Sequence, residues 1–131
     1  MDVRNASRIE PIVEHNGTTP VWYFVEPGRL REATGGGSLE LVNQFEVPLD
    51  GAVFEHTHPT HEWYYVLKGR GTMIVEGETR GIDVGDLVYI PPEARHCLRA
   101  DAGEAMRCFC FAVALPGVGS IDYTSHKSSA I

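Results

Sequence analysis

The sequence lacks the features of a membrane protein or of a secreted, disulfide-stabilised protein. No apolar run is long enough to span a bilayer, and residues 1–16 alternate charged and apolar side chains where a secretory signal has an uninterrupted apolar core. Only three cysteines are present, an odd number whose spacing fits neither a disulfide framework nor a zinc ribbon. We therefore expect a cytoplasmic protein that does not associate with a membrane.

Basic residues are also scarce. The 11 lysines and arginines stand against 18 aspartates and glutamates, which gives a formal net charge of -7. Because phosphate groups repel such a chain, its composition argues against a general nucleic-acid partner and favours a small-molecule partner. A length of 131 residues is that of one ordinary domain, so we expect one site in a single domain over residues 1–131.

Strand signals dominate the sequence, and no long helical period competes with them. Runs rich in Val, Ile, Tyr, Phe and Trp are bounded by Gly, Pro or Asp, as in all-β barrels and sandwiches. We predict one short helix at 29–33 and strands at 21–25, 39–47, 63–67, 71–76, 87–90, 96–100 and 106–114. The three glycines within 34–38 predict either a plain connection or a hinge, and residues 117–131 predict a flexible tail or a segment lying across a partner.

The histidines are unevenly distributed. Two of the six, His15 and His126, stand alone near the ends, and the others fall in or beside two turn-bounded segments of the predicted barrel: His56, His58, His61 and His96. Because successive side chains of a strand point to opposite faces, His56 and His58 project to the same side and can bind one ion.

Glu62 begins a strand on which Tyr64 and Val66 share its face. A carboxylate that points inward from such a strand needs a partner, and a metal ion would provide one. His96 follows a turn, a buried strand and a second turn made rigid by proline, which together deliver it to a neighbouring strand. Three imidazoles and one carboxylate suit Fe, Mn, Ni, Co, Cu or Zn better than Ca or Mg, which prefer oxygen ligands.

These residues resemble the two motifs of the cupin family. The first motif is a glycine, His-x-His, a glutamate and a second glycine, found here at Gly51, His56, His58, Glu62 and Gly69. The second motif is met within residues 85–96 by Gly85, Pro91 and His96. The sequence departs from that motif at Glu93, where glycine is usual, and at Ala100, where asparagine is usual.

The resemblance implies a jelly-roll β-barrel, often assembled as a homodimer, with its metal-binding motifs within residues 51–100. It implies one divalent transition-metal ion, Fe2+ or Mn2+ in the first place and Ni2+, Zn2+, Co2+ or Cu2+ as alternatives, held by His56, His58, Glu62 and His96. Such an ion keeps positions open for substrate, so we expect an enzyme. A dioxygenase acting on a small oxygen-chelating substrate, with Glu62 also serving as a base, is the first hypothesis. A lyase or isomerase, and a non-catalytic ligand-binding cupin, are the alternatives.

Residues around the expected ligands have two interpretations each. Tyr64 and Val66 line the barrel interior if Glu62 does, either as substrate contacts or as ordinary core residues. His61 is expected on the opposite face of the strand, at the surface or orienting a ligand.

The three cysteines are interpreted as small buried apolar residues and not as reactive thiols. In the strand at 106–114, either Cys108 and Cys110 or Phe109 and Phe111 face inward. Without the register of this strand, the sequence does not choose between the two faces.

Overall fold

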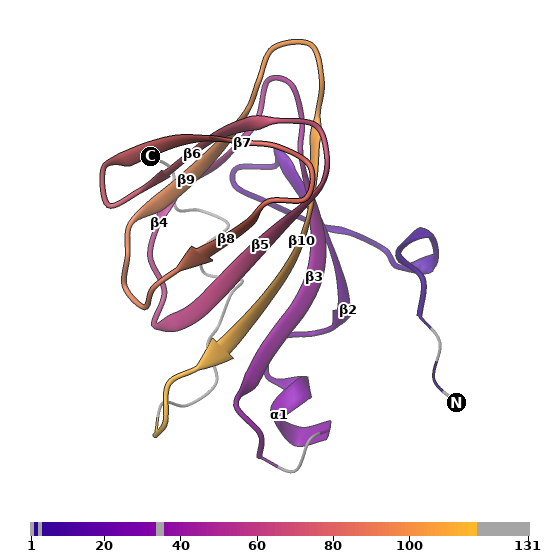
Figure 1. Ribbon diagram of the computed structural model, residues 1–131. Helices are drawn as coiled ribbons and strands as arrows, with labels where there is room; N and C mark the ends of the chain where they lie inside the picture. Colours follow the sequence, from indigo (N-terminus) through magenta and orange to yellow (C-terminus); the bar gives the residue numbers. More distant parts are fainter. Residues whose placement is uncertain (1, 3, 34–35, 118–131) are drawn as a thin grey trace.

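The computed structural model of the protein describes residues 2, 4–33 and 36–117. Within this part of the chain, two antiparallel sheets face each other as a barrel, and the expected jelly-roll architecture is confirmed (Figure 1). None of the described helices has the length and hydropathy needed to cross a membrane. Residues 118–131 of the predicted tail and residues 34–35 of the glycine-rich segment lie outside the described residues.

The larger sheet has the strand order β1-β2-β3-β10-β5-β8. Its strands are β1 (Ile12–Glu14), β2 (Thr19–Val25), β3 (Leu39–Val47), β5 (Thr60–Lys68), β8 (Leu87–Ile90) and β10 (Met106–Ala114). The smaller sheet has the order β4-β9-β6-β7, with β4 (Ala52–His56), β6 (Gly71–Val75), β7 (Glu78–Ile82) and β9 (His96–Ala100). A 3-10 turn, η1 (Ala6–Arg8), precedes β1, and the helix α1 (Arg29–Ala33) contacts β3.

Side chains alternate between the barrel interior and its outer face along the long strands, because each of these strands has only one buried face. In β10 the buried positions include Cys108 and Cys110, while Phe109 and Phe111 are only partly buried. The cysteines of β10 therefore face the barrel interior and the phenylalanines face outward, a choice that the sequence leaves open. The core between the sheets is built mainly from fully buried aliphatic and sulfur side chains: Leu41, Val47, Val66, Ile90, Leu98 and Met106.

The predicted elements are found, and three strands are missing from the prediction. The bounds of β3, β8, β9, β10 and α1 are those predicted, and the remaining predicted strands differ at their ends by one to three residues. The strands β1, β4 and β7 were not predicted. β7 is an edge strand with four exposed residues and one buried one, so it lacks the apolar alternation that marks a strand in a sequence.

Candidate metal centre

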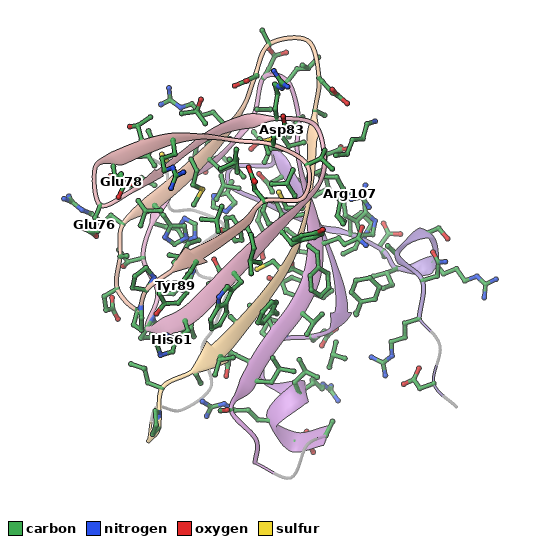
Figure 2. All side chains as sticks on the ribbon, viewed as in Figure 1. His61, Glu76, Glu78, Asp83, Tyr89 and Arg107 are labelled. Atoms are coloured by element: carbon green, nitrogen blue, oxygen red, sulfur yellow. The ribbon has the colours of Figure 1, made fainter. Side chains whose placement is uncertain are left out.

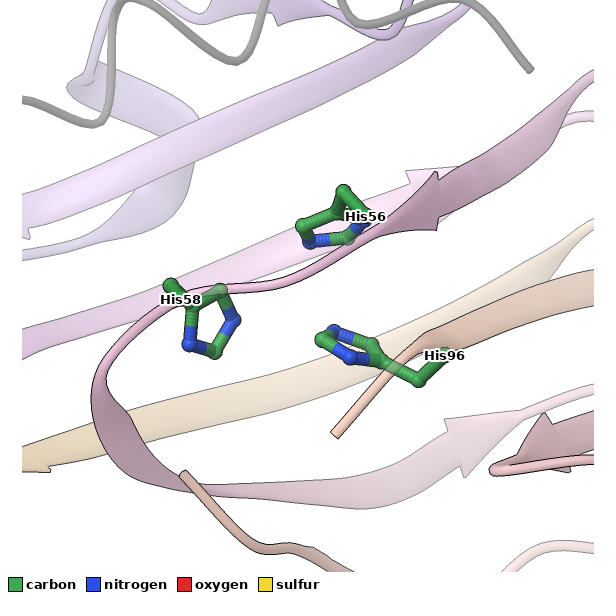
Figure 3. A group of neighbouring side chains, drawn as sticks. All are labelled: His56, His58 and His96. Atoms are coloured by element: carbon green, nitrogen blue, oxygen red, sulfur yellow. The ribbon is translucent and has the colours of Figure 1, made fainter. Parts of the chain in front are cut away.

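His56, His58 and His96 converge where β4 ends and β9 begins (Figure 3). Each ring offers one nitrogen, and these three nitrogens lie within 4.8 Å of one another. His56 and His96 are register partners on neighbouring strands, and His58 follows two residues later on the same side. Strand alternation and cross-strand pairing therefore assemble the cluster, which could hold a metal ion.

Backbone carbonyls orient two of the rings. His56 Nδ1 donates to the carbonyl oxygen of Phe54 at 2.6 Å, and His96 Nδ1 donates to that of Ala94 at 2.9 Å. Because a carbonyl oxygen only accepts, each neutral ring carries its remaining lone pair on Nε2, the arrangement commonly found in metal-binding imidazoles. His96 Nε2 is buried and has no hydrogen-bond partner in the part of the chain described. A metal ion would satisfy it, so the donor set fits such an ion.

Glu62 approaches the histidines from the opposite sheet, on β5, and is 4% exposed. Its Oε1 lies 3.1 Å from His58 Nε2 and 3.6 Å from His96 Nε2. The carboxylate thus contacts two of the three histidines, whereas the group whose donor atoms all lie within 4.8 Å consists of histidines alone. The four residues expected to bind metal are therefore neighbours.

Glu62 and His58 each stabilise the charged form of the other. Burial alone would raise the pKa of Glu62, but the charge and hydrogen bond of His58, with a smaller contribution from the nearby ring of His96, hold that pKa well below its ordinary value. Burial likewise opposes the charged form of His58, but the charge and hydrogen bond of Glu62 outweigh it and raise the pKa of His58. Burial, reinforced by the charge of His96, lowers the pKa of His56 to about 3. The carboxylate is ionised at neutral pH, and a metal cation would compete with the proton that His58 binds.

His15 belongs to the same region, so the expectation that it stands alone is wrong. It is 6% exposed, its ring centroid lies 5.0 Å from that of His56, and its Nδ1 accepts a hydrogen bond from the Phe54 N–H at 3.0 Å. A turn in which His15, Asn16 and Gly17 all have positive φ brings it there. Asn-Gly is among the strongest hairpin signals, so Asn16-Gly17 could have placed His15 in the turn between β1 and β2, although not beside His56.

His61 lies on the face of β5 opposite Glu62, as the sequence predicts. Its Nδ1 is 2.7 Å from the hydroxyl of Tyr89 on β8, and Figure 2 shows these two side chains together. The surface position, one of the two expected for it, is therefore observed. The other isolated histidine, His126, lies outside the described residues.

A narrow cavity of about 40 Å³ lies beside the histidines. The cavity is large enough for several water molecules, which suits a small ligand. Tyr64 lines the cavity together with Glu62, whereas Val66 is fully buried in the core and is not among the described lining residues. The apolar part of the wall consists of Val21, Leu41, Phe45 and Val53.

The cysteines are buried and free, as expected of small apolar residues. Burial raises the pKa of Cys108 to about 12, and burial followed by the charge of Glu62 raises that of Cys110 well above its ordinary value. Both thiols are therefore protonated at neutral pH, which is the unreactive form.

Glu93 shows why the second motif usually has a glycine. Its φ of 62° lies in the left-handed region, which is unstrained only for glycine. The N–H of Glu93 donates to the carbonyl of His58 at 2.9 Å, so this turn joins the segment of His58 to the segment leading to His96.

Two proteins related to the chain by sequence match only part of it. The chain is 34% identical over 65 residues to an uncharacterised protein of Methanocaldococcus jannaschii, covering 49% of this chain and 52% of that protein. It is 30% identical over 81 residues to an uncharacterised protein of Aquifex aeolicus, covering 61% of this chain and 67% of that protein. The matched regions thus span about half and two thirds of these relatives.

Solved structures share the fold over most of the chain. A predicted oxalate decarboxylase from Thermotoga maritima is similar with a TM-score of 0.76 at 21% identity, over 87% of this chain and 100% of that chain. The polyketide cyclase RemF from Streptomyces resistomycificus is similar with a TM-score of 0.69 at 19% identity, over 97% and 89% of the two chains. The cupin domain family matches residues 43–112, more than half of the sequence, and the chain therefore belongs to the cupin family.

Proposed function

We propose that the protein is a metal-dependent cupin enzyme in which one divalent transition-metal ion, Fe2+ or Mn2+, is held by His56, His58, Glu62 and His96. The observation that carries this proposal is the convergence of three imidazole nitrogens within 4.8 Å. Imidazole and carboxylate donors suit transition metals, and Glu62 is kept ionised by its lowered pKa. Three or four protein ligands leave further coordination positions for substrate.

The proposed reaction is a dioxygenation of a small substrate. When bound, the ion would polarise a substrate that chelates it through an enol, carboxylate or hydroxyl oxygen and would present dioxygen to it. Phe45 and Leu41 belong to an apolar part of the cavity wall that would contact the carbon atoms of the substrate. The carbonyls of Phe54 and Ala94 hold two rings in place. Glu62 Oε1, ionised at neutral pH, is the atom that accepts a proton from the substrate.

A metal-dependent lyase or isomerase is the second candidate. It is supported by two structural neighbours described as a predicted oxalate decarboxylase and a polyketide cyclase, neither of which is named as an oxygenase. In this reaction Glu62 has the same role as proton acceptor, and no dioxygen is consumed.

Anaerobic reconstitution distinguishes the two candidates. The protein is loaded with Fe2+ or Mn2+ under argon and assayed against small diketones, catechols, hydroxy acids and keto acids, with oxygen uptake recorded after air is admitted. Substrate-dependent oxygen uptake supports the dioxygenase. Turnover that continues at the same rate under argon contradicts the dioxygenase and supports the second candidate.

Metal content tests the ligand assignment independently of turnover. We expect elemental analysis to find about one transition-metal ion per chain in the wild-type protein and a loss of most of it in His96→Gln. His61→Gln is the matched control, because His61 lies on the outer face of the sheet, and it should retain the ion. Full metal occupancy in His96→Gln would contradict the proposed site.

A further inference from the structure

One row of side chains crosses the inner face of the larger sheet beside the cavity. Tyr23 on β2 pairs with Asn43 on β3, Asn43 pairs with Cys110 on β10, and Cys110 pairs with Tyr64 on β5. Register partners share a face, so the row forms a continuous wall. All four side chains are buried, and all four line the cavity.

Asn43 is the unusual member of this row. It is 5% exposed, and its Oδ1 is buried with no hydrogen-bond partner among residues 2, 4–33 and 36–117. A buried acceptor without a partner is unfavourable and is rare in native proteins. Its position on the cavity wall indicates that a bound molecule donates a hydrogen bond to it.

The adjoining part of the wall also presents acceptors. The hydroxyl of Tyr23 lies 3.1 Å from Glu14 Oε1, and both side chains line the same cavity. Because a carboxylate only accepts, Tyr23 donates its proton to Glu14, and the Tyr23 oxygen is left as an acceptor for a ligand. Asn43, Tyr23 and Glu14 together favour a hydrogen-bond donor and disfavour an anion.

We propose that Asn43 and the Tyr23–Glu14 pair select a substrate that carries a hydroxyl or ammonium group at the end opposite its metal-binding oxygen. This inference rests on the proposed function, because it places the chelating end of the substrate at the histidines and Glu62. β3 lies two strands from β5 in the sheet, about 10 Å away. A metal–oxygen bond takes up about 2 Å of this distance and a hydrogen bond about 3 Å, which leaves about 5 Å, the span of a ligand with three or four heavy atoms between its two ends.

Four ligands of similar size test this preference. β-Alanine, 3-hydroxypropanoate, butanoate and malonate share one carboxylate and end in an ammonium, a hydroxyl, a methyl group and a second carboxylate. We expect calorimetry on the full-length Mn2+-loaded protein to show 3-hydroxypropanoate and β-alanine binding at least about tenfold more tightly than butanoate and malonate.

Two substitutions test whether Asn43 and Tyr23 cause the preference for a terminal hydroxyl or ammonium group. Asn43→Leu should reduce the preference for 3-hydroxypropanoate over butanoate to less than about threefold, with unchanged Mn2+ content. Tyr23→Phe keeps the ring and should also reduce the preference. Gln44→Leu is the matched control, because Gln44 adjoins Asn43 on β3 but faces outward, and it should bind all four ligands as the wild type does.

Several results would overturn the inference. These are similar binding of the four ligands, tightest binding of malonate or butanoate, or no binding of any of them by the Mn2+-loaded protein. A preference unchanged in both Asn43→Leu and Tyr23→Phe would show that Asn43 holds only water. A wild-type protein that takes up no Mn2+ would contradict the proposed function itself, and the inference with it, and metal content distinguishes this outcome from the others.

Discussion

The rings of His15 and His56 are both hydrogen-bonded to the backbone of Phe54. The N–H of Phe54 donates to His15 Nδ1 at 3.0 Å, and the carbonyl of Phe54 accepts from His56 Nδ1 at 2.6 Å. Phe54 lies on β4 in the smaller sheet, whereas His15 lies in the turn between two strands of the larger sheet. The orientation of the His56 ring therefore depends on a turn distant from it in the sequence.

Replacing His15 tests this dependence. We expect His15→Phe to lower the affinity for Mn2+ by about tenfold, because loss of the Nδ1 acceptor releases Phe54 and thereby the ring of His56. Titration against a chelator of known affinity measures the change. His61→Phe is the control and should bind Mn2+ as the wild type does. Equal affinities in both variants would show that His15 does not position His56.

The metal-free protein should lose stability as the pH falls from 6.5 towards 4.5. The pKa of His56 is lowered from 6.5 to about 3 on folding, so between these values the unfolded chain binds more protons and acid favours unfolding. The lowered pKa of Glu62 likewise makes the folded protein less stable as the pH falls, in the range below about pH 4.5. The raised pKa of His58 acts in the other direction, because its contribution is complete below pH 6.5 and is lost as the pH rises through the folded value.

Urea unfolding measures this pH dependence. For His56 we expect a loss of about 2 kcal/mol in the free energy of unfolding between pH 6.5 and pH 4.5. His56→Gln, which cannot titrate, should show a correspondingly smaller loss. If the two proteins lost stability in parallel over this interval, the lowered pKa of His56 would be refuted.

Glu93→Gly should stabilise the barrel. Glycine adopts a φ of 62° without the steric strain that Glu93 bears, and we expect a gain of about 1 kcal/mol in the free energy of unfolding. The control is Glu78→Gly in the exposed edge strand β7, which should lose about 0.5 kcal/mol because glycine weakens a regular strand. Destabilisation by both substitutions would show that the Glu93 side chain compensates for its backbone.

Alanine substitutions at Gly69 and Gly77 distinguish the cost of backbone strain from the cost of a steric clash. Both have positive φ, but a Cβ at Gly69 would lie 2.6 Å from the carbonyl oxygen of Ala105, whereas a Cβ at Gly77 meets nothing within 4 Å. We expect Gly77→Ala to cost about 1 kcal/mol and Gly69→Ala to cost about 2 kcal/mol more. Thermal or urea unfolding of the two variants measures the difference, and equal losses would exclude a role for this contact.

The sequence predicts the parts of the structure that depend on local pattern. The strand β10 is recognisable from its apolar residues, and the spacing of His56, His58 and Glu62 predicts that they are close. The inward direction of Cys108 and Cys110 is not predictable in this way, because both faces of β10 carry apolar side chains and only its pairing with other strands distinguishes them.

The parts that the sequence does not predict depend on contacts between distant segments. His15 reaches His56 because the β1–β2 turn lies against β4, and no local pattern encodes that contact. Asn43 is likewise an ordinary polar residue in the sequence. Its place beside Tyr23 follows from the register between β2 and β3, which a single sequence does not determine.

The three histidines belong to the β4–β9 side of the barrel, and Glu62 belongs to the opposing sheet. A cation bound by these groups would cross-link the two sheets, and its bonds to one sheet would have to break before the sheets could separate. Loading with metal should therefore prolong the lifetime of the folded protein against heat and proteases by slowing its rate of unfolding, beyond what equilibrium affinity alone would provide.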